Sequence, residues 1–350
     1  MHTNDDHSDV KQYYGEVLSS NKDLKTNACC TSDSLSDDVR GALKLIHPEI
    51  TDRFYGCGSP IPPLVSGLTV LDLGCGTGRD SFVLAKLVGP EGRVIGVDMT
   101  EEQIAIGIKH IDHQTKTFGF SKPNIEFKLG KIENLVELGL TDNSVDLVVS
   151  NCVINLSPDK EAVFREIFRV LKPGGELFFS DIFSDRRVPG NLAKDPVLRG
   201  ECLGGALYIQ DFRRLVSKLG CHDYRVVSSR PIAIGNKALE ELIGNIEFSS
   251  LTIRAFKLAL EDRCEDYGQV AYYLGTVPGS PHAFLLDDHH LFRTDQPHLV
   301  CGNTASMLSE TRYKNHFKVM GEQSQHFGLF CCDDPSDQKI TLNRTESACC

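Results

Sequence analysis

The amino-acid sequence predicts an α/β fold, in which a doubly wound, mostly parallel sheet precedes a smaller mixed α+β domain. Three observations predict it. Short apolar runs alternate with amphipathic stretches from residue 69 to residue 228. A glycine-rich loop follows the first apolar run directly, at residues 74–78. Beyond Pro231 the alternation weakens, which indicates that a second unit begins there. Strands that alternate with helices usually pair in parallel, with helices on both faces of the sheet.

The spacing of apolar residues predicts the individual elements. A short helix is expected over residues 10–18, and Ser36 would cap a second helix over residues 36–50. Strands are expected at 69–73, 93–97, 125–129, 145–149, 176–180 and 224–228. Helices are expected through 84–88 and over 101–118, 158–171 and 210–219. The proline and glycines of residues 172–175 would end the helix over 158–171.

These elements divide the chain into four segments. Residues 1–66 form a helical and loop segment, and residues 67–230 form the domain built on the parallel sheet. Residues 231–330 form the smaller C-terminal domain. Residues 331–350 are polar apart from two cysteine pairs, and we expect this tail to be disordered.

Composition and charge exclude several classes of protein. The 350 residues are 41% hydrophobic and 24% charged, which is ordinary for a globular protein. The net charge of −11 argues against non-specific nucleic-acid binding, which needs a basic surface. No apolar run has the length of a membrane span, and the N-terminal residues are too polar for a targeting peptide. We therefore expect a soluble protein of the cytoplasm, and as a separate expectation we take it to be a monomer.

The chain contains 13 cysteines, an unusual number for a cytoplasmic protein. No two of them have the C-x-x-C spacing typical of zinc ribbons and thioredoxin-like sites. Three adjacent pairs occur instead, at residues 29–30, 331–332 and 349–350. Cytoplasmic thiols in this number suggest binding of a soft element or thiol redox chemistry. The alternative is that many of them are small buried apolar residues.

The loop after the first predicted strand reads Asp72-Leu73-Gly74-Cys75-Gly76-Thr77-Gly78. Glycines between a strand and a helix let the backbone approach a ligand closely. The loop is not the dinucleotide fingerprint, because residue 79 is arginine where that pattern requires glycine. Asp98 ends the second predicted strand, where an acidic side chain can accept hydrogen bonds from ribose hydroxyls. The alternative is a tight turn that binds no ligand.

The pattern D-x-G-x-G-x-G, followed by an acidic residue after the next strand, resembles the class I S-adenosylmethionine-dependent methyltransferases. Ile132-Glu133 after the third strand and the run 169–175 before the fifth strand are also similar to that superfamily. The resemblance implies a Rossmann-like fold with S-adenosylmethionine as cofactor. It implies that the cofactor is bound by Tyr55, Asp72, Gly74, Gly76, Gly78, Asp98, Met99, Ile132, Glu133 and Asn151.

Four cysteine-containing segments resemble the arsenite methyltransferase family, over about residues 12–255. They are Tyr55-Gly56-Cys57-Gly58, residues 150–156 around Cys152, residues 200–208 around Cys202, and residues 26–29, which end in Cys29. The resemblance implies that Cys57, Cys152 and Cys202 bind As(III). It also implies that Cys29 is the redox partner of Cys57, with thioredoxin or glutathione restoring the thiols. Cys30 stands beside Cys29, so either cysteine could be that partner.

The chemistry of arsenic agrees with this resemblance. Trivalent arsenic is soft and prefers sulfur ligands. Cys152 follows the fourth predicted strand, at the carboxyl edge where open α/β sheets bind their ligands. Cys202 lies in a glycine-rich stretch after the fifth strand that could fold back over this edge.

Two other functions fit part of the sequence. One is a class I methyltransferase acting on a small organic molecule such as a quinone or a sterol, which would not use Cys57 or Cys202. The other is a non-catalytic thiol protein that sequesters metalloids. Among the remaining side chains, we expect Cys75, Cys221 and Cys264 to be packing residues and leave Cys301 unassigned. We expect the histidine pairs 110/113 and 289/290 to be solvated.

Overall fold

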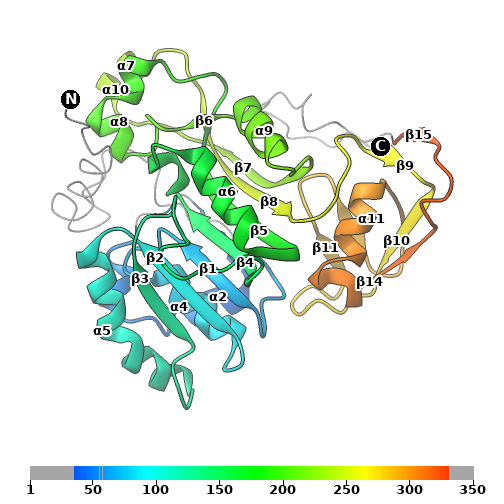
Figure 1. The fold of residues 1–350 in the computed structure, drawn as a ribbon, viewed down its shortest axis with the longest axis horizontal. Helices are drawn as coiled ribbons and strands as arrows, with labels where there is room; N and C mark the ends of the chain where they lie inside the picture. Colours follow the sequence, from blue (N-terminus) through cyan, green and yellow to red (C-terminus); the bar gives the residue numbers. More distant parts are fainter. Residues whose placement is uncertain (1–34, 55, 57, 331–350) are drawn as a thin grey trace.

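The computed structural model describes residues 35–54, 56 and 58–330 (Figure 1). A sheet with the order β3-β2-β1-β4-β5-β8-β7 forms its centre, and β6 pairs with β5. The strands are β1 (Thr69–Leu73), β2 (Arg93–Asp98), β3 (Ile125–Leu129), β4 (Val145–Asn151), β5 (Leu171–Ser184), β6 (Leu207–Tyr208), β7 (Tyr224–Pro231) and β8 (Phe248–Phe256). Pairs among β1 to β6 are parallel, whereas β8 is antiparallel to both β5 and β7. The doubly wound, mostly parallel sheet is therefore confirmed.

The helices include α2 (Asp37–Leu43), α3 (Pro48–Thr51), α4 (Arg79–Val88), α5 (Glu101–Phe118), η3 (Ile154–Leu156), α6 (Lys160–Val170) and α9 (Ile209–Lys218). Three short helices, α7 (Gly190–Ala193), α8 (Pro196–Gly200) and α10 (Lys237–Ile243), lie together at the top of Figure 1. The single helix expected over 36–50 was wrong. Ser36 does cap α2 by accepting a hydrogen bond from the Val39 amide, but the segment breaks before Pro48. Proline disfavours a helical conformation of the residue before it.

Two further expectations need correction. The helix expected over 158–171 does end just before residues 172–175, at Val170, but the fifth strand begins at Leu171 and includes these residues, so it is longer than the expected 176–180. The sheet also continues past residue 230, because β8 lies between β5 and β7. The helix α10 connects β7 to β8, and β8 then pairs antiparallel with both β7 and β5, so this last strand departs from the parallel pattern of the rest of the sheet. The helix expected over 10–18 and the tail 331–350 lie outside the described residues.

Alternate residues of the central strands pack against opposite helical layers. Leu71 and Leu73 of β1 belong to a core that includes Phe164 of α6 and Phe212 of α9. Val70, directly before Leu71 in the strand, belongs to a second core with side chains of α2 and α4. Successive side chains of a strand point to opposite faces, so a buried sheet needs apolar residues on both.

A mixed α+β region follows β8, on the right of Figure 1. Its elements are β9 (Glu265–Asp266), β10 (Gln269–Tyr273), β11 (Ala283–Leu285), β12 (Leu291–Arg293), β13 (Pro297–Val300), α11 (Gly302–Ser309), η4 (Arg312–Asn315), β14 (Phe317–Met320) and β15 (Gly328–Leu329). The sheet β13-β10-β14 and two smaller strand pairs are antiparallel. This region has its own core, which contains Phe284, Phe292 and Phe317.

Buried charges join this region to the central sheet. Arg254 of β8 donates to Glu176 of β5 at 2.5 Å, to the Leu286 carbonyl at 2.5 Å and to the Tyr313 hydroxyl at 2.8 Å. Arg312 forms a second ion pair with Glu176. The side chains of Arg254 and Glu176 are at most 1% exposed. The contact between the two regions is therefore fixed by hydrogen bonds that water does not reach.

The helices of the described part of the chain differ from membrane spans. None of these helices combines the length and the apolar character that crossing a bilayer requires.

Candidate functional site

A cavity of about 880 Å³, part of it open to solvent, lies at the carboxyl ends of β1, β2, β3 and β4. Eight residues singled out in the sequence line it: Gly74, Gly76, Asp98, Met99, Ile132, Glu133, Asn151 and Cys152. The other lining residues are Arg53, Phe54, Cys75, Thr77, Arg79, Thr100, Gln103, Gly130, Val153, Leu156 and Ser157. The parallel strands thus bring together residues that are up to 104 positions apart, from Arg53 to Ser157.

The glycines of the loop after β1 are needed for two different reasons. A Cβ on Gly74 would lie 2.2 Å from the Val153 side chain, and one on Gly78 would lie 2.5 Å from Phe127. A Cβ on Gly76 would meet no atom within 4 Å, although its φ of +54° also favours glycine. Gly74 and Gly78 therefore permit close packing, whereas the backbone at Gly76 is open on the cavity side.

Asp98 lies at the end of β2 and lines the cavity. One carboxylate oxygen accepts the amide of Gly76 at 2.9 Å, and the other accepts the amide of Thr100 at 2.8 Å. Burial raises the pKa of Asp98, and these backbone hydrogen bonds oppose the rise. A carboxylate has about four acceptor positions, so Asp98 keeps acceptor capacity for a ligand.

Asp72 is not among the residues that line the cavity. Its carboxylate is buried and accepts a hydrogen bond from the Ser81 hydroxyl in the first turn of α4. Burial raises the pKa of Asp72 to about 7, and the charge of Asp80 adds to the effect. The Asp72 carboxylate therefore contacts the first turn of α4, directly after the glycine loop.

Asn151 ends β4 and holds a distant segment of the chain against the cavity. Its side-chain amide donates to the Gly58 carbonyl and to Asp80, both at 2.9 Å, and accepts the Gly58 amide at 3.3 Å. A Cβ on Gly56 would lie 2.6 Å from Asn151, and one on Gly58 would lie 2.6 Å from Ser180. The two glycines therefore permit this approach. Tyr55 and Cys57, like Cys29 and Cys30, lie outside the described residues.

Cys152 and Cys202 meet beside the cavity, although 50 residues separate them. The Cys202 thiol donates to the Cys152 carbonyl at 3.2 Å, and both residues are at most 2% exposed. Each adopts a left-handed backbone conformation, with φ of +57° at Cys152 and +62° at Cys202. Non-glycine residues rarely adopt this conformation, which costs about 1–2 kcal/mol. Cys152 is in a disulfide, whereas Cys202 is not disulfide-bonded.

Two ionisable residues near these cysteines were missed in the sequence. Asp181 of β5 is 1% exposed and accepts the amides of Asn155 and Ile182. Burial raises the pKa of Asp181 to about 7, although both amides and the charge of Lys160 oppose the rise. Burial lowers the pKa of Lys160, which the charges of Asp181 and Cys202 oppose. No local motif marks either residue; an aspartate within an apolar strand was the available signal.

Arg79 and Phe54 form a stacked pair at the cavity, which sequence reasoning also missed. The guanidinium carbon lies 3.1 Å from the centroid of the Phe54 ring. Arg79 also donates to Asp80 at 2.6 Å, and Asp80 in turn accepts from Asn151. The position of Arg79 directly after the glycine loop could have suggested a role at the site.

The remaining cysteines mostly have structural positions. Cys75 is buried, and burial raises the pKa of its thiol. Burial raises the pKa of Cys221 to about 12. Cys264 is partly exposed, and Cys301 caps α11 by accepting the Thr304 amide.

The expectation for the histidine pairs was wrong in one case. His113 and His289 are exposed, and His290 is partly exposed. His110, however, is 6% exposed and is paired with Glu49. Helical spacing alone did not show that α3 would cover this face of α5.

Comparison with known proteins gives consistent results. A family model described as a methyltransferase domain matches residues 64–220, and one described as the arsenite methyltransferase C-terminal domain matches residues 266–345. An arsenite methyltransferase of Aquipseudomonas alcaligenes is 50% identical over 347 residues, covering 98% of this chain and 100% of the relative. The arsenite methyltransferase of Homo sapiens is 41% identical over 315 residues, covering 89% of this chain and 83% of the relative.

A solved structure agrees with these relatives. It is the crystal structure of CrArsM, an arsenic(III) S-adenosylmethionine methyltransferase from Chlamydomonas reinhardtii. The match has a TM-score of 0.82 at 50% identity, and it covers 85% of this chain and 100% of that chain. Two relatives matched over most of their length, together with this fold, show that the chain belongs to the arsenite methyltransferase family.

Proposed function

We propose that the chain transfers the methyl group of S-adenosylmethionine to trivalent arsenic held by cysteine thiolates, and so detoxifies arsenic as methylated arsenicals. The observation that carries this proposal is the meeting of Cys152 and Cys202 beside the cavity, at 3.2 Å from thiol to carbonyl. Membership of the arsenite methyltransferase family supports the same reaction.

The cavity has features that suit S-adenosylmethionine, which supplies an electrophilic methyl group when bound. The open backbone at Gly76 allows close approach, and Asp98 has acceptor positions for ribose hydroxyls. We assign Met99, Ile132 and Glu133 to the cofactor because they line the same cavity. Asp72 would act indirectly, by holding the first turn of α4, which follows the glycine loop.

Cys152, Cys202 and Cys57 would bind As(III) as three thiolates, which suit this soft element. Asn151 supports the assignment of Cys57, because it holds the neighbouring Gly58 against the end of β4. The arsenic lone pair would attack the methyl carbon, and the sulfonium sulfur would leave as a neutral thioether. No proton moves in this step, so positioning would supply most of the rate.

The electron balance requires a reductant. Methylation converts As(III) to As(V), and two electrons return when a pair of thiols forms a disulfide. We assign this role to Cys29 with Cys57, with Cys30 as the alternative partner, and propose thioredoxin or glutathione as the reductant. Cys152 is disulfide-bonded in this structure, so it must be reduced before it can bind arsenic. A cytoplasmic location would provide such reductants.

The test is to incubate the purified protein with arsenite, S-adenosylmethionine and a thiol reductant, and to speciate the arsenic by mass spectrometry. We expect methylated arsenicals, and we expect Cys202→Ser to lower the rate on the order of 100-fold or more, because a hydroxyl does not replace a thiolate on arsenic. S-adenosylmethionine affinity, measured by calorimetry, should be unchanged.

Cys221→Ser is the matched control, because Cys221 is also buried but its thiol donates to the Asp223 carbonyl, whereas the Cys202 thiol donates to Cys152. It should retain activity. Wild-type rates for Cys202→Ser would remove Cys202 from the ligand set. Methylation of a quinone or sterol without methylation of arsenite would favour the organic-substrate alternative. Arsenite binding without any methyl transfer would favour the sequestering protein.

A further inference from the structure

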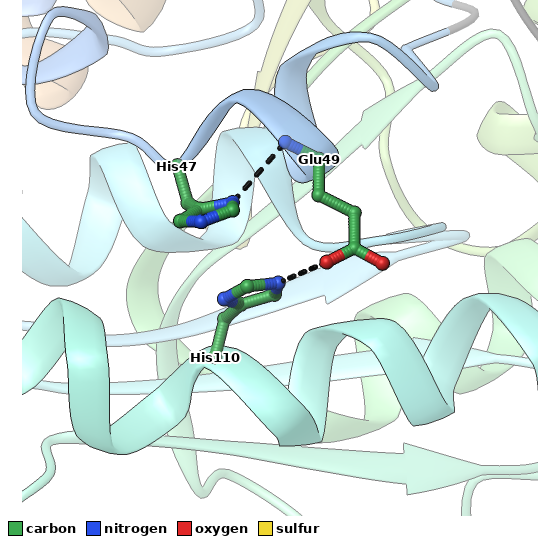
Figure 2. A group of neighbouring side chains, drawn as sticks. All are labelled: His47, Glu49 and His110. Carbon is green, nitrogen blue, oxygen red and sulfur yellow. Dashed lines mark hydrogen bonds and ion pairs between the residues drawn. The ribbon is translucent and has the colours of Figure 1, made fainter.

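A cluster of imidazole and carboxylate groups lies between α3 and α5, apart from the cavity. His47 caps α3, Glu49 lies in its first turn, and His110 faces them from α5 (Figure 2). One ligand atom from each of the three residues lies within 4.8 Å of the other two. The His110 side chain is 7% exposed and that of Glu49 is 35% exposed, so the group is only partly open to water.

The contacts within the cluster are short. His110 Nε2 lies 2.8 Å from Glu49 Oε2, and His47 Nδ1 accepts the Glu49 amide at 3.2 Å. The His47 and His110 rings stack with their centroids 4.1 Å apart. The ring of His113, one turn further along α5, lies edge-on to His47 at 5.3 Å. Two separate elements thus bring three imidazoles and one carboxylate together.

We infer that His47, Glu49 and His110 form a binding site for a divalent transition-metal ion such as Zn²⁺, with His113 able to supply a fourth ligand. Imidazole nitrogens with one carboxylate are the donors that Zn²⁺, Co²⁺ and Ni²⁺ bind, whereas Ca²⁺ and Mg²⁺ prefer oxygen ligands. Ligands drawn from two elements would also let a bound ion join α3 to α5.

Lys109 competes for the same carboxylate oxygen. Its ammonium lies 2.7 Å from Glu49 Oε2, and its side chain is 61% exposed. A metal ion would have to displace this ammonium, which is free to move into water. His47 would also exchange the hydrogen bond at Nδ1 for a metal bond, or bind through Nε2. Lys109 therefore distinguishes a metal site from a cluster held only by ion pairs. Its ammonium would compete with a metal ion for Glu49, whereas without a metal ion it adds a favourable interaction with that carboxylate.

A metal ion bound by this cluster would influence the lining of the cavity through one hydrogen bond. The Thr77 hydroxyl of the glycine loop donates to the Ile50 carbonyl of α3 at 3.0 Å. Fixing α3 against α5 would therefore support the loop that lines the cavity. An ion that binds the folded chain also stabilises it by mass action.

The experiment is a titration of the full chain with Co²⁺ under reducing conditions, followed by absorption spectroscopy. Cobalt bound by thiolates gives intense near-ultraviolet charge-transfer bands, so a nitrogen and oxygen site is recognised by weak visible bands alone. We expect one such ion per chain, and an increase in Tm of about 2–4 °C with saturating ion. His110→Ala and Glu49→Gln should each lose this ion and leave the thiolate bands unchanged.

Two variants make the test specific. Lys109→Ala should tighten Co²⁺ binding severalfold, because it removes the competing ammonium. His282→Ala, which changes an exposed histidine of the C-terminal region, should bind the ion as wild type does. The inference fails if no nitrogen and oxygen site is seen, if Glu49→Gln binds the ion as tightly as wild type, or if Lys109→Ala does not alter the affinity.

Discussion

Asp72 combines burial with a carboxyl group whose pKa is raised to about 7. In the unfolded chain this group loses its proton near pH 4. Between pH 4 and pH 7 the folded state therefore holds a proton that the unfolded state releases, so the free energy of unfolding falls as pH rises. Above pH 7 the Asp72 carboxyl is ionised in both states, so its effect on the free energy of unfolding no longer changes with pH. Asp72 thus holds the first turn of α4 through its hydrogen bond to Ser81, but its ionised form lowers the free energy of unfolding.

We predict that Asp72→Asn stabilises the protein at pH 8 by a few kcal/mol, since about 1.4 kcal/mol corresponds to each pKa unit. The amide oxygen can still accept from Ser81. Urea unfolding measured at intervals from pH 4.5 to pH 8 checks this. Part of the slope should remain, because burial also raises the pKa of Asp181 to about 7. Asp112→Asn, at an exposed position of α5, is the control. Identical slopes for Asp72→Asn and wild type would contradict the prediction.

At the scale of elements, the end of β4 holds the segment around Gly58 in place through Asn151. Removing this side chain leaves two buried backbone groups of Gly58 without a partner, at about 1–3 kcal/mol for each. We predict that Asn151→Ala lowers arsenite methylation about tenfold or more. S-adenosylmethionine affinity should change much less.

Methylation kinetics and calorimetry on the same variant check this prediction. Asn245→Ala, at an exposed position, is the control and should behave as wild type. If Asn151→Ala instead lost cofactor affinity and activity in equal measure, its main contact would be with the cofactor, as the family resemblance implied.

Local patterns explain which elements could be predicted. The strands β1 to β4 are short apolar runs beside a glycine loop, and such runs are visible in the sequence alone. β8 was missed, since Arg254 interrupts its apolar pattern, and the carboxylate that compensates this charge lies 78 residues earlier. The break before Pro48 was available from the sequence, because proline disfavours a helix through the residue before it.

The residues of the candidate site likewise include some that local patterns predict and others that depend on tertiary packing. Gly74, Gly76 and Asp98 follow strands whose ends were predicted, so their convergence at one edge could be inferred. Asp181 and Lys160 depend on how β5 and α6 pack behind Cys202, which no local pattern encodes. The second role of Asn151 likewise depends on a contact with Gly58, 93 residues away.

On the scale of the whole molecule, Glu176 is the buried counter-charge for two arginines. It pairs with Arg254 of the central sheet and with Arg312 of the C-terminal region. Removing one partner of a buried ion pair typically destabilises a protein by about 3–5 kcal/mol, because the remaining charge stays buried. We predict that Glu176→Gln destabilises the whole chain by this amount.

Calorimetry and urea unfolding check this value. Glu126→Gln, which removes an exposed ion pair with Arg93, should change stability by about 0.5 kcal/mol or less. A loss in Glu176→Gln no larger than in this control would mean that the contact between the two regions does not depend on buried charge.

The left-handed backbone at Cys152 and Cys202 has a consequence for how such a site is maintained during evolution. Glycine and asparagine adopt this conformation at lower cost, so selection for stability alone would favour them at both positions. Functional residues are often retained although they lower the stability of the protein. Cysteine differs from glycine and asparagine here only in what its side chain can do. Both cysteines have an unfavourable backbone conformation, and the Cys202 thiol lies 3.2 Å from the Cys152 carbonyl. These two facts support selection for the sulfur atoms themselves.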